Sequence, residues 1–87
     1  MISYRVVMEE KALKELKAIS NPVKSNIFNK IKQLQSLNTE TRNIKKIANY
    51  TEGYRLRVGN YRILFTKNDL EKTIKVYQIG HRKEIYR

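Results

Sequence analysis

The sequence predicts an α+β fold of order β-α-α-β-β-β, in which a small, antiparallel-rich sheet carries a helical hairpin packed on one face. Apolar residues recur every three or four positions in the first half of the chain, as in amphipathic helices, and at every second position in the second half, as in half-buried strands. A chain of 87 residues without repeats fits one domain spanning residues 1–87. The hairpin and one sheet face cover each other, which leaves the other sheet face open.

Three elements are expected in the first half. Residues 2–8 are short and rich in β-branched side chains, which is typical of a strand. The apolar positions of the first helix are Ala12, Leu13, Leu16 and Ile19, and those of the second are Val23, Ile27, Ile31, Leu34 and Leu37. Between the helices, Asn21 is the expected N-cap and Pro22 the first helical residue, where a missing N–H costs nothing.

The second half is expected to form strands. A basic connector at 44–49 is followed by a hairpin, a third strand at 73–79 and a basic tail at 81–87. The hairpin strands Tyr54–Val58 and Tyr61–Thr66 flank Gly59-Asn60, a two-residue turn in which glycine supplies the positive φ.

The turn determines which hairpin side chains share a face. Arg57 lies opposite Arg62, so Arg55, Arg57 and Arg62 lie together on the open face while the alternate residues point to the core. Like charges placed directly across a strand pair are destabilising. Three arginines on one face despite this cost favour a phosphate-binding site, because guanidinium groups bind phosphate in bidentate fashion. The alternative is a set of solvated side chains, or pairing with the few carboxylates.

Composition narrows the function. The net charge of +11 predicts a polyanionic or acidic partner, because self-repulsion opposes folding unless opposite charge offsets it. The absence of Cys excludes disulfides and thiolate chemistry and suits a cytoplasmic protein. A single His leaves a metal site short of ligands, so neither a metal nor a cofactor is expected. No apolar run approaches the ~20 residues of a membrane span, so no membrane partner is expected.

The charge is unevenly distributed. Residues 1–40 hold seven basic and four acidic side chains, a balance of +3, whereas residues 41–87 hold twelve and four, a balance of +8. Five of the six tyrosines lie in the second half, and Tyr86 is the best candidate for an exposed ring on which a base could stack. The second half is therefore expected to face the partner.

Two stretches of this half resemble the RelE toxins of the RelE/ParE superfamily. They are GYRLRVGNYRILF at residues 53–65 and VYQIGHRKEIYR at residues 76–87. The first strand and the helical hairpin, with ALKEL at residues 12–16, match the layout of that family, so the resemblance covers essentially the whole chain. It implies a toxin of a type II toxin–antitoxin pair that enters the ribosomal A site, cleaves mRNA there and stops translation. It also implies a cognate RelB-like antitoxin, for which the basic surface suggests an acidic, partly disordered segment.

The functional positions of the family fall on the hairpin and the tail. They correspond to Arg55, Arg57 and Arg62 in the hairpin and to His81, Arg82 and Tyr86 in the tail. The best-known relatives carry Lys at the first two positions, and since Arg cannot act as a base, any role that needs a deprotonatable amine is in question here. Lys45 and Lys46 are expected to be general RNA contacts rather than catalysts.

Metal-independent RNA cleavage proceeds by attack of a 2′-OH on the neighbouring phosphate. Arg57, Arg62 and Arg82 are expected to stabilise the charge of the phosphate in the transition state. Histidine ordinarily titrates near neutral pH, and neighbouring cations favour the anion of Tyr86. Either His81 or Tyr86 is therefore expected to accept the 2′-OH proton, while the other, or Arg82, assists the leaving group. The alternative for His81 is a strand-end residue that makes one backbone hydrogen bond.

Three other functions remain open at this point. A ParE-like toxin would share the fold but act on DNA gyrase without cutting RNA. A non-catalytic nucleic-acid-binding module would need the net charge alone. A degenerate toxin would be kept only for its complex with the antitoxin. The set of arginines together with Tyr86 favours cleavage over the ParE-like activity.

Overall fold

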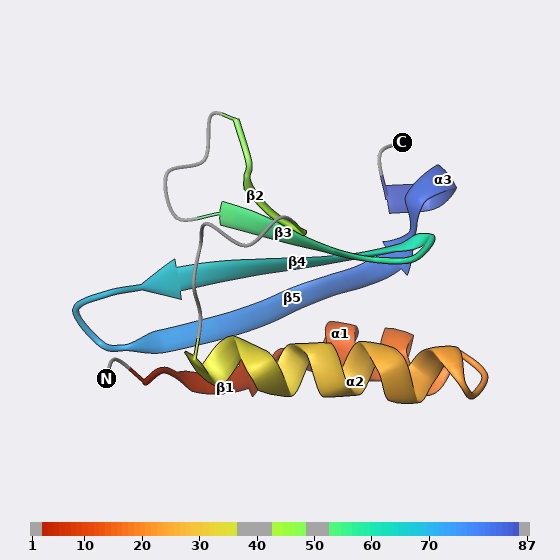
Figure 1. Cartoon of the computed structure of the whole chain (residues 1–87), viewed down its shortest axis with the longest axis horizontal. Coiled ribbons are helices and arrows are strands. Elements are labelled where there is room, and N and C mark those ends of the chain that lie inside the picture. The colour runs from red at the N-terminus through yellow and green to blue at the C-terminus, as the bar shows by residue number, and fades with distance from the viewer. Residues whose placement is uncertain (1–2, 37–42, 49–52, 86–87) are drawn as a thin grey trace.

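A computed structural model of the chain describes residues 3–36, 43–48 and 53–85. It contains a mixed five-stranded sheet in the order β1-β5-β4-β3-β2, with two helices side by side against one face (Figure 1). The strands are β1 (Arg5–Met8), β2 (Ile44–Lys46), β3 (Gly53–Val58), β4 (Tyr61–Asn68) and β5 (Thr73–His81). Only β1 and β5 pair in parallel, and the other neighbours are antiparallel. The predicted α+β class, with a helical hairpin on one sheet face, is confirmed.

The helical hairpin consists of α1 (Glu10–Lys17) and α2 (Val23–Gln33), and a short 3-10 turn, η1 (Leu34–Ser36), extends α2. The buried residues of these elements are Ala12, Leu16, Ile27, Ile31 and Leu34, all at predicted apolar positions. Leu37 lies outside the described residues. In the described ranges, no helix is long and apolar enough to cross a membrane.

The start of α2 differs from the prediction by one residue. Pro22 takes the N-cap position, with φ −84° and ψ −4°, and no side chain caps the helix, so the assignment of Asn21 as N-cap was wrong. A backbone turn replaces the side-chain cap, because the Lys24 N–H donates to the carbonyl of Ser20 at 3.1 Å. The Asn21 Oδ1 instead accepts a hydrogen bond from the Ser25 hydroxyl at 2.8 Å.

The strand β2 was not predicted, since residues 44–49 were expected to be a connector. Ile44 is buried opposite Leu56, while Lys45 lies opposite Arg55. One inward-facing apolar residue gives too little alternation to identify a strand. Short edge strands rich in lysine are nevertheless common, because they discourage pairing with other chains.

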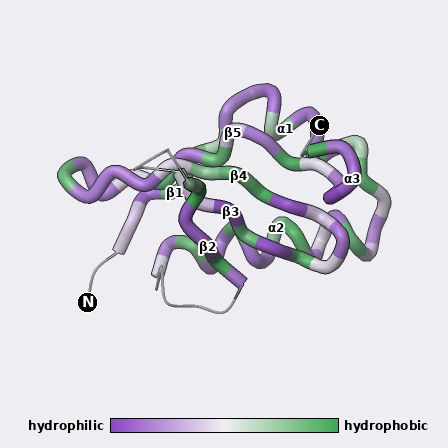
Figure 2. Tube along the Cα trace, turned by 90° about the horizontal axis from the view of Figure 1, so that it is seen from above, coloured by the Kyte–Doolittle hydropathy of each residue, from purple (hydrophilic) through white to green (hydrophobic). Residues whose placement is uncertain are grey.

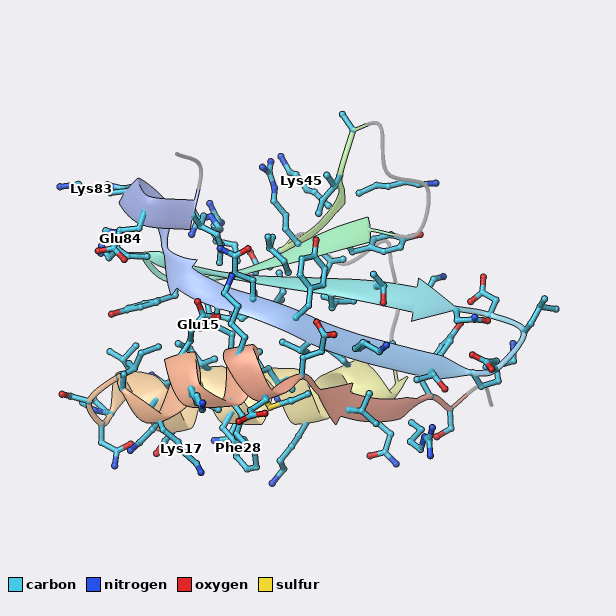
Figure 3. All side chains as sticks on the ribbon, turned by 180° about the vertical axis from the view of Figure 1, so that it is seen from behind. Glu15, Lys17, Phe28, Lys45, Lys83 and Glu84 are labelled. Atoms are coloured by element: carbon cyan, nitrogen blue, oxygen red, sulfur yellow. The ribbon has the colours of Figure 1, made fainter. Side chains whose placement is uncertain are left out.

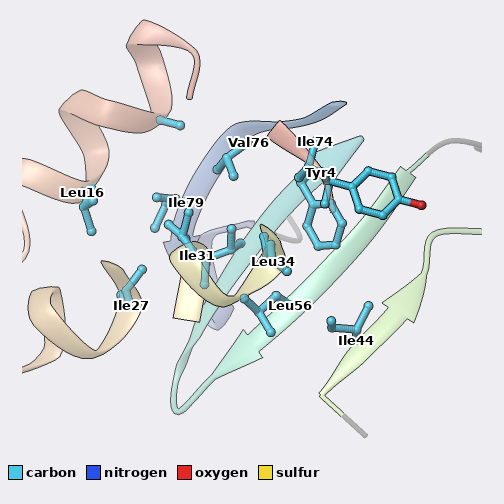
Figure 4. Packing of buried hydrophobic residues seen from close by; sticks show 13 residues of the cluster. Tyr4, Leu16, Ile27, Ile31, Leu34, Ile44, Leu56, Ile74, Val76 and Ile79 are labelled. Atoms are coloured by element: carbon cyan, nitrogen blue, oxygen red, sulfur yellow. The ribbon is translucent and has the colours of Figure 1, made fainter. Parts of the chain in front are cut away.

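The core lies between the helices and one face of the sheet (Figure 4). Its largest fully buried side chains are Phe65, Ile27, Ile63, Ile74 and Val76. Because side chains alternate along a strand, the neighbours of these sheet residues point to the open face. The core therefore determines which side chains the open face presents.

Tyr4 connects the start of the chain to the loop between β4 and β5. Its ring is buried, and its hydroxyl donates a hydrogen bond of 2.7 Å to the Asp69 Oδ1, which also lies 3.4 Å from the Lys67 Nζ. The hydrogen bond to Asp69, followed by burial, raises the pKa of Tyr4. The same hydrogen bond lowers the pKa of Asp69 below its ordinary value of 3.8.

We expect Tyr4→Phe to lower stability by about 1 kcal/mol near pH 7, because the hydroxyl donor is lost. Because the pKa of Asp69 is lowered in the folded state, the stability contributed by its carboxylate is present above pH 3.8. This stability is lost as the pH falls through the folded-state pKa. Urea unfolding of both proteins at pH 7 and at acid pH measures the difference. The difference in free energy of unfolding between the wild type and Tyr4→Phe should be smaller at acid pH. A difference that does not depend on pH would contradict the role of Asp69.

Candidate functional site

The hairpin has the predicted register. Arg57 pairs with Arg62 across β3 and β4, and Val58 pairs with Tyr61 at the turn. Gly59 has the expected positive φ of 58°. Figure 2, which looks onto the sheet from above, shows hydrophilic and hydrophobic residues alternating along these strands. The arginine cluster, defined as Arg55, Arg57 and Arg62, therefore lies on the face opposite the core.

Two members of the arginine cluster have neutral hydrogen-bond partners. The Arg57 Nη2 donates to the Asn43 Oδ1 at 3.3 Å. The Arg62 Nη1 donates to the carbonyl oxygens of Gly59 and Tyr61, both at 3.0 Å. These bonds hold the two guanidinium groups without neutralising them, and each keeps further N–H donors for an anion.

The adjacent lysines of β2 lie on opposite faces. Lys45 pairs with Arg55 and lies on the side of the arginine cluster, above the sheet and away from the helices in Figure 3. Lys46 pairs with Tyr54, whose ring packs against the core, and so lies on the helix side. Of the two expected RNA contacts, only Lys45 shares a face with the arginines.

The predicted basic tail begins as a short helix, α3 (Arg82–Ile85), which follows β5 directly. Figure 1 shows α3 on the open side of the sheet, opposite α1 and α2. The Arg82 N–H donates to the carbonyl of Asn60 at 2.8 Å, which anchors the start of α3 to the hairpin turn. Ile85 packs over Gly80, the residue that pairs with Arg62. These contacts bring the start of α3 to the end of the sheet that carries Arg62.

His81 lies on the other face. It pairs with Tyr61, and the two rings form an edge contact with centroids 5.6 Å apart. The His81 Nδ1 accepts a hydrogen bond of 3.1 Å from the Lys83 N–H. In a neutral ring the proton then resides on Nε2, so this tautomer offers a donor and no free acceptor. This geometry corresponds to the strand-end alternative considered for His81.

Tyr86, the other expected acid–base residue, lies outside the described residues. Among the residues that the structure describes, no group of three or more His, Cys, Asp or Glu side chains could hold a metal ion. In the described part of the site, Arg57 and Arg62 are cations held by neutral oxygens, and His81 lies on the other face.

A bulge in β5 determines which side chains of this strand point to the core and which to the open face. The sequence analysis missed it. Leu64 pairs with Gln78 and Phe65 with Val76, so Tyr77 is an extra residue in β5. The buried positions are consequently Ile74, Val76 and Ile79. This interrupted apolar spacing was the available signal, because strict alternation would put residue 78 in the core.

Glu15 is a second residue that the sequence analysis missed. It reaches from α1 toward β5 in Figure 3, and its Oε1 accepts a hydrogen bond of 2.9 Å from the Ile79 N–H. The strand β1 ends at Met8, opposite Val76, so this edge of β5 continues past its neighbouring strand. The Glu15 carboxylate takes the place of a strand there and supports the segment that leads into His81 and Arg82.

We expect Glu15→Ala to destabilise the protein by about 1–3 kcal/mol, because the partly buried Ile79 N–H loses its acceptor. Glu15→Gln should cost less, since its amide oxygen can still accept. The matched control is Glu10→Ala on the same helix, which breaks only an exposed ion pair with Lys14 and should cost about 0.5 kcal/mol or less. Urea unfolding measures all three, and equal effects of Glu15→Ala and Glu10→Ala would contradict the role of Glu15.

Comparison with known proteins identifies the family. A family model described as the ParE toxin of the type II toxin–antitoxin system parDE matches residues 6–86. Toxin RelE3 of Methanocaldococcus jannaschii is 38% identical over 85 residues, which cover 94% of each chain. The chain belongs to the RelE-type toxins of the RelE/ParE superfamily.

Solved structures agree with this assignment. The toxin in the RelB–RelE antitoxin–toxin complex from Methanococcus jannaschii matches this RelE-type toxin with a TM-score of 0.77 and 34% identity, covering 92% of this chain and 94% of that one. The archaeal RelE–RelB complex from Pyrococcus horikoshii OT3 gives a TM-score of 0.79 at 22% identity, covering 94% and 98% of the two chains. The latter similarity establishes the shared fold.

Proposed function

We propose that this RelE-type toxin is a ribosome-dependent endoribonuclease that cleaves mRNA in the A site and inhibits translation. The observation that carries the proposal is the hairpin pair Arg57 and Arg62, which lie opposite each other on an open face and are bonded only to neutral oxygens in the described part of the chain. Two adjacent cations held in this way are unfavourable for folding, and a bound phosphate offsets that cost.

In the proposed reaction, the 2′-oxygen of one nucleotide attacks its own 3′-phosphate. A bond forms between the 2′-oxygen and phosphorus, and the bond from phosphorus to the 5′-oxygen of the next nucleotide breaks. The 2′-OH proton goes to a base that starts deprotonated, and the departing 5′-oxygen takes a proton from solvent water. The products are a 2′,3′-cyclic phosphate and a 5′-OH, and no metal takes part.

The residues have different roles in this proposal. Arg57, Arg62 and Arg82 stabilise the charge on the phosphate, which preorganised donors achieve without rearranging. Tyr86 accepts the 2′-OH proton, and Arg82 assists the leaving group. We assign the base to Tyr86 rather than His81 because the Nδ1 of His81 already accepts from Lys83 and its ring lies on the helix side.

These roles give opposite expectations for two substitutions. Tyr86→Phe should lower ribosome-dependent cleavage by about 10²- to 10⁴-fold, the usual contribution of a general base. His81→Ala should leave most of the cleavage intact. Cleavage rates in a translation extract measure both effects, and loss of cleavage in His81→Ala but not in Tyr86→Phe would reverse the assignment.

The ribosome is expected to supply much of the catalysis. Holding the reacting groups in place can contribute about 7–11 kcal/mol, and the ribosome positions the mRNA in the A site. A ribosomal substrate also implies a cytoplasmic site of action, as the composition suggests.

An antitoxin is the proposed protein partner. The relatives from M. jannaschii and P. horikoshii were solved as complexes of RelE with RelB. In this chain, the net charge of +11 favours an acidic partner, and the partly exposed Leu13, Val23 and Phe28 of the helices offer apolar anchors.

A ParE-like action on DNA gyrase is the second candidate, because the matching family model is described as a ParE toxin. A translation extract and a gyrase reaction, each with added toxin, separate the two. Cuts in mRNA at ribosome-dependent positions would support the proposal. Gyrase-linked DNA breaks without mRNA cuts would overturn it.

A further inference from the structure

A second basic feature lies at the β1 edge of the sheet, at the end far from the hairpin turn. An open groove of about 820 Å³ lies there, between the start of the chain and the loop that joins β4 to β5. Its lining residues are Ser3, Tyr4, Arg5, Val7, Gln35, Glu71, Lys72, Thr73 and Lys75. Three of these are cations and one is an anion, so the groove has a positive balance.

The sheet register places part of the groove lining on the same face as the arginine cluster, while the buried Tyr4 and Gln35 of η1 line its other side at the edge of β1. Val6 and Met8 of β1 pack against the core, so Arg5 and Val7 point to the opposite face. Lys75 pairs with Val7 and also lies on that face. Six residues of β4, or about 20 Å at about 3.4 Å per residue, separate Arg62 from Asn68, which pairs with Thr73 at the groove end of the sheet. Arg55 lies nearer, because its partner Leu64 is two residues from Thr66, the partner of Lys75. One phosphate between Arg57 and Arg62 therefore cannot also contact Arg5.

The groove cations are not neutralised by the groove anion. Arg5 and Lys75 form no ion pair with a carboxylate in the described ranges. The Glu71 Oε1 accepts a hydrogen bond of 3.3 Å from the Asn68 Nδ2, and the Lys72 Nζ lies 5.7 Å from the centre of the Tyr4 ring. The charges of Arg5 and Lys75 therefore remain available to a ligand, whereas Lys72 also lies close enough to Asp69 to help lower the pKa of that carboxyl group.

Lys72 has an unfavourable backbone conformation. Its φ of 52° is the only positive φ of a non-glycine residue in the described part of the chain. Glycine or asparagine is the usual occupant of such a position. The carbonyl of Lys72 accepts the Arg5 N–H at 2.8 Å, a contact that any residue could make. The Lys72 side chain lies over the Tyr4 ring, and this cation–π contact holds its charge beside the groove.

We propose that this groove binds backbone phosphates of RNA, at a site distinct from the arginine cluster. Arg5, Lys72 and Lys75 hold the phosphates of a segment that lies away from the cleaved bond. The choice of RNA rests on the proposed function, whereas the presence of an anion site does not. A single strand that crossed the open face would contact both features.

The test uses the full chain and a fluorescent 2′-O-methyl oligoribonucleotide, which lacks the attacking hydroxyl. A length of about 12 nucleotides spans both features even at the compact spacing of about 3.4 Å per nucleotide that a strand has in a double helix. Anisotropy over a series of salt concentrations gives the slope of log affinity against log salt. The variant Lys72→Gly/Lys75→Gln should reduce the magnitude of this slope by about 1.4, which is about 0.7 for each lost phosphate contact on a single strand.

Stability provides the second measurement. The Lys72→Gly change relieves the positive φ, so the melting temperature of the double variant should not fall. The matched control is Lys11→Gln/Lys30→Gln, which removes the same charge from exposed positions of α1 and α2, on the other side of the sheet. Its salt slope should stay close to that of the wild type.

Two results would overturn the proposal. One is a salt slope of the groove variant equal to that of the control. The other is unchanged RNA binding with weakened binding of a poly-glutamate peptide, which would assign the groove to an acidic protein partner. Failure of the proposed function is distinguishable, because it would appear as absent mRNA cleavage while the groove variant still weakened RNA binding.

Discussion

Arg62→Ala should reduce ribosome-dependent mRNA cleavage by about 10²- to 10³-fold, the usual cost of removing one preorganised donor from a developing charge. The Arg62 guanidinium is held at the hairpin turn by hydrogen bonds to the carbonyls of Gly59 and Tyr61, so it is positioned before a phosphate binds. Quantitative primer extension in a translation extract measures the rate.

Stability should change in a different direction from activity. Arg62→Ala removes the repulsion with Arg57 across the strand pair, so the melting temperature should stay the same or rise. Arg62→Lys keeps the charge but loses the planar fork, and its cleavage rate should be intermediate. Full cleavage by Arg62→Ala, or loss of cleavage explained by unfolding, would contradict a role for Arg62 at the phosphate.

Phe65→Ala should destabilise the fold by about 3–5 kcal/mol, because it removes a large side chain from a close-packed core. Phe65 is 0% exposed, and its ring stacks on Tyr54 with centroids 5.6 Å apart. Against a total of about 5–15 kcal/mol for a typical domain, this loss is large. Urea unfolding at neutral pH measures it.

The matched control for this substitution is Leu70→Ala. Leu70 is 97% exposed in the loop between β4 and β5, so its removal should change stability by about 0.5 kcal/mol or less. Similar effects of Phe65→Ala and Leu70→Ala would mean that the core is not packed as described.

The hairpin could be predicted because its information is local. Gly59 requires a particular turn, and the turn determines every pair from Val58 and Tyr61 outward, including Arg57 and Arg62. The arginine cluster therefore followed from the sequence without knowledge of the rest of the sheet. The edge strand β2 did not, since its pairing depends on β3 rather than on its own three residues.

The position of His81 shows why the remaining site could not be predicted. In an unbroken strand, His81 would lie on the face opposite Val76 and therefore on the side of the arginines. The bulge at Tyr77 shifts the alternation by one residue and turns His81 toward Tyr61. The contact of Glu15 with Ile79 links residues 64 positions apart, which no local pattern reports.

The most direct test of the proposed chemistry is cleavage of an mRNA with a single 2′-deoxynucleotide on the 5′ side of the mapped cut. The unmodified mRNA should be cut in a translation extract to give a 2′,3′-cyclic phosphate and a 5′-OH. The deoxy-substituted mRNA should remain intact at that bond, because the attacking oxygen is absent. Cleavage of the substituted bond at the normal rate would contradict 2′-OH attack and, with it, the proposed role of the arginine cluster.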